Sequence, residues 1–238
     1  MYYVGISVVL LLSAILLRRN NHLGRYFHVA FAFFLAAFVS GLQQIAISLG
    51  WWSGSTMFEI VAPTVLNTLL VVVPIVTLTK ITGGSMASIY VARGRLWLGL
   101  AVGSVAFILF LVTSVEGAAT LFAGKNLSFE RVLPWMPWVM AFVLSNGVRE
   151  ELWMRGIFLK RFETFVGSKT ANLLQAAVFS LAHVDVQYTP ELLIFLGITF
   201  FLGLGFGFVI QKTRSLLGAI LFHAGADVPV IIGVFSNL

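Results

Sequence analysis

The sequence predicts an all-α protein, a multipass transmembrane helical bundle of about eight spans. Its mean hydropathy is +0.99, and 59% of its 238 residues are apolar whereas only 10% are charged. A chain with so little polar surface cannot cover a water-soluble globule. Apolar runs also recur along the whole chain, and most are about long enough to cross a ~30 Å hydrocarbon layer as helices. These observations place the protein in a lipid bilayer.

Eight apolar runs are the expected spans. They cover residues 2–17, 27–49, 58–79, 96–115, 132–149 with a helical continuation past residue 160, 171–183, 191–210 and 216–235. Pro134 and Pro137 suit the first turn of the fifth helix, where a missing N–H does no harm. Gly203 and Gly207 in the seventh span let a neighbouring helix approach closely. A polar segment over 116–131 divides the chain into N-terminal helices, 1–131, without an assigned role, and a C-terminal half, 132–238.

Basic residues are concentrated in alternate connections between the spans. Thirteen of the 15 Lys and Arg lie beside or after the first, third, fifth and seventh spans, and only Lys125 and Arg131 fall on the other side. Because basic loops stay in the cytoplasm, we expect a cell-membrane protein with both termini outside. This pattern accounts for the net charge of +6 without a nucleic-acid partner. The absence of Cys excludes disulfides, thiolate metal sites and a Cys nucleophile.

Ionisable residues inside the spans are the candidate functional residues, because each costs on the order of 2 to 3 kcal/mol near the bilayer centre. Those that lie deep within a span belong to the C-terminal half, and they form three motifs. These are Glu150-Glu151-Leu152-Trp153-Met154-Arg155, Phe179-Ser180-Leu181-Ala182-His183 and His223-Ala224-Gly225-Ala226-Asp227. A lone buried His is more often a packing residue, but three such motifs on separate spans indicate one functional site.

Helical geometry separates the roles of the two adjacent glutamates. Glu150 and Glu151 point about 100° apart, whereas Glu151 and Arg155 share a face. Glu151 is therefore expected to pair with Arg155 and to support the site, while Glu150 points elsewhere. At ~1.5 Å per residue, Glu150 lies roughly 20 to 24 Å from the outer end of its helix, so we expect the site to open toward the cytoplasmic side. Arg149 is interpreted as a topology signal only.

The three motifs, in this order on successive helices, resemble those of the CPBP family of intramembrane proteases, which comprises CAAX prenyl protease 2 and bacteriocin-processing proteins (the ABI family). The family motifs are Glu-Glu-x-x-x-Arg, Phe-x-x-x-His and His-x-x-x-Asn/Asp. The resemblance covers about residues 132–235, so it implies a CPBP-like catalytic helical core over 132–238. It implies an intramembrane endopeptidase acting on a membrane-associated peptide or protein, which enters from the bilayer or its cytoplasmic face.

Peptide hydrolysis needs an activated water and donors for the oxyanion. A carboxylate in a poorly hydrated cavity is a stronger base, so we expect Glu150 to activate the water with His183 beside it. The resemblance implies the same roles and assigns the oxyanion to His223 and Asp227. Asp227 can donate only when it is protonated, so its alternative role is to fix the tautomer of His223.

Other functions remain open from the sequence. If the enzyme depends on zinc, Glu150, His183 and His223 are the ligands, although no His-Glu-x-x-His motif is present and we expect no cofactor. A non-catalytic membrane scaffold or bacteriocin-immunity protein could keep the same fold. A proton-coupled transporter could use buried Glu and His as a relay, but confinement of these groups to one half of the chain argues against an inverted-repeat carrier.

Overall fold

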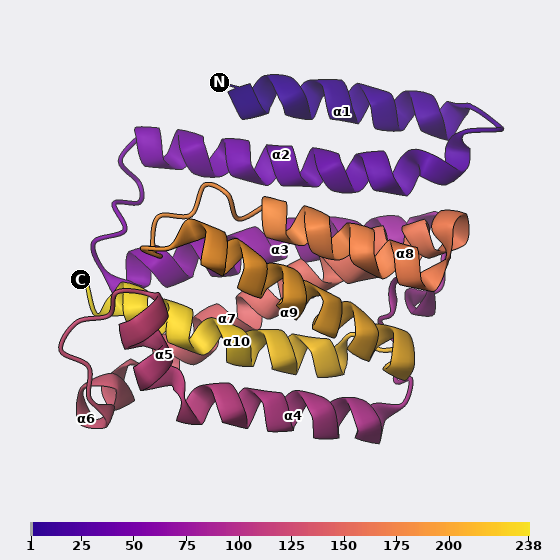
Figure 1. The fold of residues 1–238 in the computed structure, drawn as a ribbon. Coiled ribbons are helices and arrows are strands. Elements are labelled where there is room, and N and C mark those ends of the chain that lie inside the picture. Colours follow the sequence, from indigo (N-terminus) through magenta and orange to yellow (C-terminus); the bar gives the residue numbers. More distant parts are fainter. Residues whose placement is uncertain (1) are drawn as a thin grey trace.

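The computed structural model describes residues 2–238, apart from the side chains of Tyr2, Arg25, His28, Ala32 and Ala36. Over this range the chain forms helices and no strand, which confirms the all-α class. Eight long helices correspond to the eight expected spans and lie alongside one another in one bundle (Figure 1). They are α1 (Tyr2–Arg19), α2 (Phe27–Ser48), α3 (Met57–Ile81), α4 (Leu96–Val112), α7 (Met136–Glu151), α8 (Lys160–Leu181), α9 (Leu192–Thr213) and α10 (Leu217–Phe235).

Short helical elements connect the long helices. They are η1 (Gly24–Tyr26), η2 (Met86–Ile89), α5 (Ser114–Leu121), α6 (Phe129–Val132), η3 (Leu133–Trp135) and η4 (Leu152–Leu159). By length and composition, four helices of the described range can cross a membrane: α2 from Val29 onward, α3, α9 and α10. A fifth span results if α4 and α5, which are bent by 65° relative to each other, count as one.

The chain passes from α7 to α8 without leaving the helical state. Its eight connecting residues, η4, are π-helical, a rare geometry that is frequent at functional sites. As predicted, Pro137 lies in the first turn of α7 and the helical path continues past residue 160, whereas Pro134 lies in η3, before α7. α8 then bends sharply at Gly167, whose φ of 76° and ψ of 164° are open to glycine but strained for other residues. This bend returns the chain across the bundle toward His183.

Helix α10 is the central helix, and it packs on α4, α5, α7 and α9 (Figure 1). Its crossing with α4 is close because glycines lie at the contact. A Cβ atom on Gly103 would lie 2.5 Å from the carbonyl oxygen of Gly218, and a Cβ atom on Gly225 would lie 2.6 Å from the Cα atom of Phe107. Small residues of this kind let helix backbones approach. The contact fixes α10, which carries His223 and Asp227, against α4.

We expect Gly225→Ala to lower the free energy of unfolding by about 1–3 kcal/mol, because the added methyl group must displace backbone atoms of α4. Gly197→Ala in α9 is the matched control, since no neighbouring atom lies within 4 Å of a Cβ atom at that position. Both variants gain the higher helix propensity of Ala over Gly, ~0.8–1 kcal/mol, and only Gly225→Ala adds a steric clash. Thermal unfolding in detergent measures both variants. Equal Tm values for the two would contradict the close α4–α10 contact.

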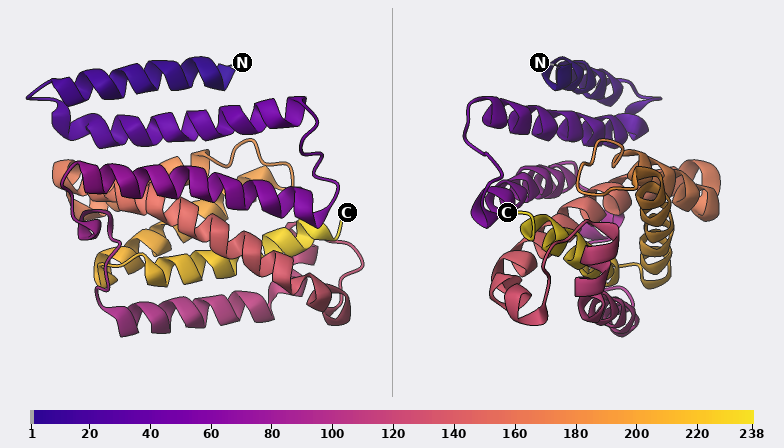
Figure 2. Two further views of the ribbon diagram at one scale, coloured as in Figure 1. Left: turned by 180° about the vertical axis from the view of Figure 1, so that it is seen from behind. Right: turned by 60° about the vertical axis from the view of Figure 1, so that its left-hand side comes forward.

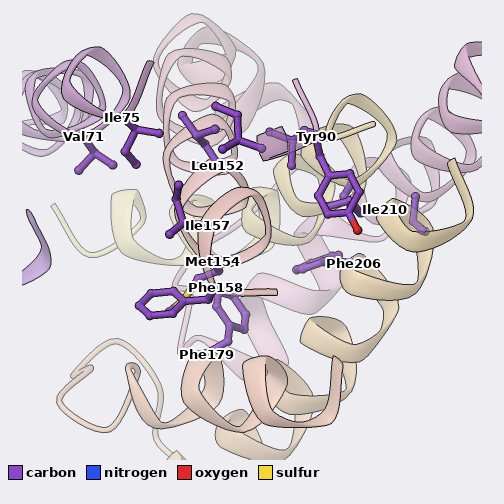
Figure 3. Close-up of a cluster of buried hydrophobic side chains, with 14 of the residues drawn as sticks. Val71, Ile75, Tyr90, Leu152, Met154, Ile157, Phe158, Phe179, Phe206 and Ile210 are labelled. Atoms are coloured by element: carbon purple, nitrogen blue, oxygen red, sulfur yellow. The ribbon is translucent and has the colours of Figure 1, made fainter. Parts of the chain in front are cut away.

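Two hydrophobic clusters hold the helices that carry the motifs. The larger joins α3, η4, α8, α9 and the segment before α4, and Figure 3 shows its side chains converging around η4. It includes Val71, Ile75, Tyr90, Leu152, Met154, Ile157, Phe158, Phe179, Phe206 and Ile210. The second joins α5, α7 and α10 through Ala118, Val139, Val143, Ala224, Val228, Ile231, Ile232 and Phe235. As predicted, α9 meets α8 closely at Gly203, where an added Cβ atom would lie 3.2 Å from the Cα atom of Ala176.

The two ends of the bundle differ in charge. We define the basic end as the one that carries the α1–α2, α3–α4 and α9–α10 connections and the bend of α8 at Gly167, and the acidic end as the one that carries the α2–α3, α5–α6 and α8–α9 connections and the C-terminus (Figure 1). The basic end has one acidic residue, Glu163, and the basic residues Arg18, Arg19, Arg25, Lys80, Arg93, Arg95, Lys160, Arg161, Lys169, Lys212 and Arg214. The acidic end has Lys125 and Arg131 together with Glu59, Glu116, Glu130, Asp185 and Glu191.

Candidate active site

A cavity of about 970 Å³ lies among α2, α3, α7, α8, α9 and α10. Its wall includes the four residues that the sequence predicts as catalytic, Glu150, His183, His223 and Asp227. Three separate helical segments therefore bring their motifs to one space. The supporting residues of the prediction do not line this space. Glu151 and Arg155 lie behind its wall and are fully buried.

The buried pair of Glu151 and Arg155 forms as predicted and also holds His223. Arg155 Nη1 donates to Glu151 Oε1 at 2.8 Å, and His223 Nδ1 donates to the same oxygen at 2.7 Å. Because a carboxylate paired with Arg accepts hydrogen bonds, Nδ1 of His223 carries a hydrogen. The alternative role predicted for Asp227, to fix the tautomer of His223, is therefore wrong. Glu151 does this, because its oxygen reaches Nδ1 from α7, whereas Asp227 lies on the Nε2 side of the ring at 3.6 Å.

Aromatic rings enclose the cation and the imidazole. The guanidinium carbon of Arg155 lies 4.3 Å from the ring centre of Phe179 and 5.1 Å from that of Phe206. His223 stacks on Phe206 with ring centres 4.7 Å apart and planes 10° apart. Such cation–π contacts stabilise a desolvated guanidinium. Phe179, the first residue of the Phe-x-x-x-His motif, therefore supports Arg155 as well as leading to His183.

A chain of hydrogen bonds links Glu150 to Asp227. Arg149 Nη2 donates to Glu150 Oε1 at 2.8 Å and also to Asn146 Oδ1, and Asn146 Nδ2 donates to Asp227 Oδ2 at 2.8 Å. The other oxygens of the two carboxylates approach His223. Nε2 of that ring lies 3.7 Å from Glu150 Oε2 and 3.6 Å from Asp227 Oδ1, which is longer than a hydrogen bond. Each carboxylate thus has one oxygen held and one available in the cavity.

His183 follows α8 directly and is half-buried. Its Nδ1 atom lies 2.7 Å from the carbonyl oxygen of Phe179. A carbonyl oxygen only accepts, so Nδ1 carries the hydrogen and the neutral ring keeps a lone pair on Nε2. Edge contacts with Phe179 and Phe195 orient the ring, with centres 4.8 and 5.8 Å apart. His183 is therefore built to accept a proton or a hydrogen bond through Nε2.

The structure adds residues that the sequence interpretation missed. The interpretation of Arg149 as a topology signal only is wrong, because its side chain lines the cavity and bonds to Glu150. Asn146 also lines the cavity, and its spacing of four residues from Glu150 was a usable signal, since residues four apart share a helix face. Tyr188, in the α8–α9 connection, lines the cavity and packs on Phe195 with ring centres 5.5 Å apart. No sequence pattern distinguishes it.

Tyr188 keeps its hydroxyl proton over a wide pH range. Burial raises the pKa of Tyr188 above its usual value, and the carboxylates of Asp227 and Glu150 raise this pKa further. A phenol in this state is a hydrogen-bond donor at the mouth of the cavity.

The cavity opens toward the acidic end, whereas the sequence interpretation has the site open toward the basic, cytoplasmic side. Residues of the acidic end line its mouth: Trp52, Ser53, Gly54, Glu59, Leu121, Phe122, Asp185, Val186, Tyr188 and Val234. Among the described residues, none from the connections of the basic end lines it. A distance along the fifth helix gives a depth in the membrane only if that helix is perpendicular to the bilayer, but α7 crosses the bundle obliquely (Figure 2). The bend at Gly167 also returns His183 to the acidic end.

Zinc would require three converging ligands at ~2.0–2.2 Å from the metal. Within residues 2–238, no group of three or more His, Asp and Glu side chains is placed so that it could hold a metal ion. Glu150, His183 and His223 share the cavity, but they do not converge as a ligand set.

The comparison with protein families gives one match. Residues 132–229 match the family model of type II CAAX prenyl endopeptidase Rce1-like proteins. The matched segment contains all three motifs and confirms the resemblance to the CPBP family. The chain matches no curated protein and no solved structure. Residues 132–229 are thus similar to the Rce1-like type II CAAX prenyl endopeptidases.

Proposed function

We propose that the protein hydrolyses a peptide bond inside the membrane by means of a water activated by Glu150, without a metal ion. One observation carries the proposal. Two carboxylates and two imidazoles, from Glu150, Asp227, His183 and His223, share one cavity of an otherwise apolar bundle. Such groups are costly in a bilayer and mark functional sites, and the Rce1-like match makes peptide hydrolysis the reaction to test.

Glu150 is the base. Its Oε1 atom accepts from Arg149, so Oε2 is the oxygen available to the water. In the first step Oε2 takes a proton from the water while the water oxygen forms a bond to the carbonyl carbon of the peptide. In the second step the proton moves to the amide nitrogen as the C–N bond breaks. His183 has a lone pair on Nε2 and accepts a hydrogen bond there from the second O–H of the water. This hydrogen bond orients the water.

The oxyanion needs hydrogen-bond donors in a dry site. His223 provides Nε2–H when its ring is protonated, since its Nδ1–H is already bonded to Glu151. Asn146 provides the second hydrogen of its amide group, because only one of the two is bonded to Asp227. Asp227 then acts through these two residues. It orients the Asn146 amide, and its Oδ1 atom lies 3.6 Å from Nε2 of His223.

The membrane and the substrate in which the reaction takes place follow from the charges and the cavity wall. The distribution of basic residues favours a multipass protein of the cell membrane with both termini outside. Most of the side chains that line the cavity are apolar. We therefore propose a membrane-associated peptide or protein as the substrate.

The direct test is proteolysis by purified protein in detergent or liposomes with a library of membrane peptides. We expect cleavage by the wild type and a loss of about 10²–10⁴ in kcat/KM for His183→Ala, because the water loses its second acceptor. His22→Ala, at an exposed histidine of the α1–α2 connection, is the matched control and should retain activity. Equal cleavage by the wild type and His183→Ala would overturn this mechanism. Absence of cleavage by every form would favour a scaffold or a proton-coupled transporter.

Treatment with a chelator separates this mechanism from zinc catalysis. We expect kcat to be unchanged after the protein is incubated with a strong zinc chelator and dialysed, because Glu150 and His183 alone activate the water. Loss of activity that added Zn²⁺ restores would show instead that Glu150, His183 and His223 hold a catalytic metal.

A further inference from the structure

The cavity extends to the acidic end of the bundle. Its wall reaches the protein surface at the α2–α3 connection, the end of α5 and the α8–α9 connection, all at the acidic end. Trp52, Phe122 and Tyr188 give this mouth three aromatic side chains, which suit the headgroup region of a membrane. Substrate therefore has a path from this end of the bundle to Glu150.

The other end is closed by packed side chains. Ile89 and Tyr90, in the α3–α4 connection, and Leu159, at the end of η4, are each at most 2% exposed, and none of them lines the cavity. Tyr90 donates through its hydroxyl to Glu163 Oε2 at 2.6 Å, and Gln211 Nε2 donates to Glu163 Oε1 at 2.9 Å. This hydrogen-bonded layer, together with the core shown in Figure 3, separates the site from the basic end.

The charge of the two ends decides their sides of the membrane. Eleven basic residues and one acidic residue lie at the closed, basic end. The open end has two basic and five acidic residues, so the contrast is large. Basic connections are retained in the cytoplasm. The closed end therefore faces the cytoplasm, and the mouth of the cavity faces away from it.

The mouth is also negatively charged. Glu59 and Asp185 lie at its rim, and Glu150 and Asp227 lie deeper. Arg149 is the one Lys or Arg in the wall over the described range, and its charge is paired with Glu150. A cleft with walls of low dielectric focuses such a potential and raises the local concentration of cations.

We infer that the cavity takes its substrate from the non-cytoplasmic side of the membrane, and that this substrate is an extended, cationic peptide segment lying at that surface. The inference rests on the proposed peptidase function. It adds the side of entry and the charge class of the substrate, both of which follow from the position of the mouth and its carboxylates.

The absence of cysteine from the chain makes the side of entry directly measurable. Val184→Cys introduces a thiol beside the mouth, at a residue that is 43% exposed, and Lys169→Cys introduces one at an exposed position of the basic end. We expect a membrane-impermeant maleimide added to intact cells to label Val184→Cys at once. Lys169→Cys should react only after the membrane is permeabilised. The reverse pattern would overturn the inference and would leave the peptidase proposal intact.

The charge class is tested with matched fluorogenic peptides that carry Lys and Arg, or Glu, next to the cleaved bond. We expect the cationic peptide to be cleaved with a kcat/KM roughly tenfold or more above that of the acidic one, and high salt to reduce this ratio. Asp185→Lys should lower kcat/KM for the cationic peptide by roughly tenfold. Glu191→Lys is the control, because Glu191 is exposed at the same end but does not line the cavity.

The outcomes separate the two proposals. If the detergent-purified protein cleaves no peptide of either charge, the peptidase proposal fails. If it cleaves in detergent while intact cells do not cleave the peptide added outside, the side of entry is wrong. Equal kcat/KM values for the cationic and acidic peptides, or equal effects of Asp185→Lys and Glu191→Lys, would overturn the charge class.

Discussion

Replacement of Glu150 by glutamine is expected to lower kcat for peptide hydrolysis by about 10²–10⁴, the contribution of a general base. Glutamine has the same shape, and its amide oxygen can still accept from Arg149, which bonds to Glu150 Oε1 at 2.8 Å. It cannot take a proton from water. The effect should therefore fall on kcat, with KM changed little, since the side chain acts on the reacting water more than on the bound peptide.

Steady-state kinetics and thermal unfolding of the same preparation test this expectation. Glu150→Gln should unfold near the Tm of the wild type, because the variant keeps the contact with Arg149. Glu116→Gln, at an exposed carboxylate of α5, controls for the loss of one negative charge and should keep the wild-type kcat. Activity of Glu150→Gln within threefold of the wild type would show that another group is the base.

Replacement of Arg155 by methionine is expected to destabilise the protein by about 3–5 kcal/mol, the usual effect of breaking a buried ion pair. Arg155 and Glu151 are both fully buried. Without the guanidinium, the Glu151 carboxylate keeps His223 as its one hydrogen-bond partner over the described range. The rings of Phe179 and Phe206, which enclose the cation, would then contact an apolar side chain next to an uncompensated charge.

The expected result is a lower Tm in detergent together with lower activity, because His223 loses its fixed orientation. The double variant Glu151→Gln with Arg155→Met removes both charges. It should be less destabilised than the two single variants added together, which is the signature of residues in contact. Arg93→Met, at an exposed arginine of the basic end, is the control and should stay within about 0.5 kcal/mol of the wild type. Additive effects of the two single variants would contradict the role of this pair.

Much of the fold and the identity of the motif residues could be predicted from the sequence. Apolar runs of nearly membrane-spanning length define the helices, because a backbone in lipid must satisfy its own hydrogen bonds. Charged and His residues are so costly in that setting that Glu150, His183 and His223 could be singled out as candidates. Residue spacing alone placed Glu151 and Arg155 together, because residues four apart share a helix face. The hydrogen bond between them confirms this.

The arrangement of the site was decided by the tertiary structure. Residue spacing along one helix does not show which side chains of another helix it contacts. It could therefore not predict the hydrogen bonds between Glu151 and His223 or between Asn146 and Asp227. It also assumes a straight, regular helix. The oblique path of α7 (Figure 2), the π-helical segment and the bend at Gly167 move His183 and the cavity mouth to the acidic end. The sequence by itself thus determined which side chains must be shielded from the lipid, because that depends on the free-energy cost of placing each side chain in hydrocarbon. Only the packing of the helices decided how these residues pair and from which end of the bundle they are reached.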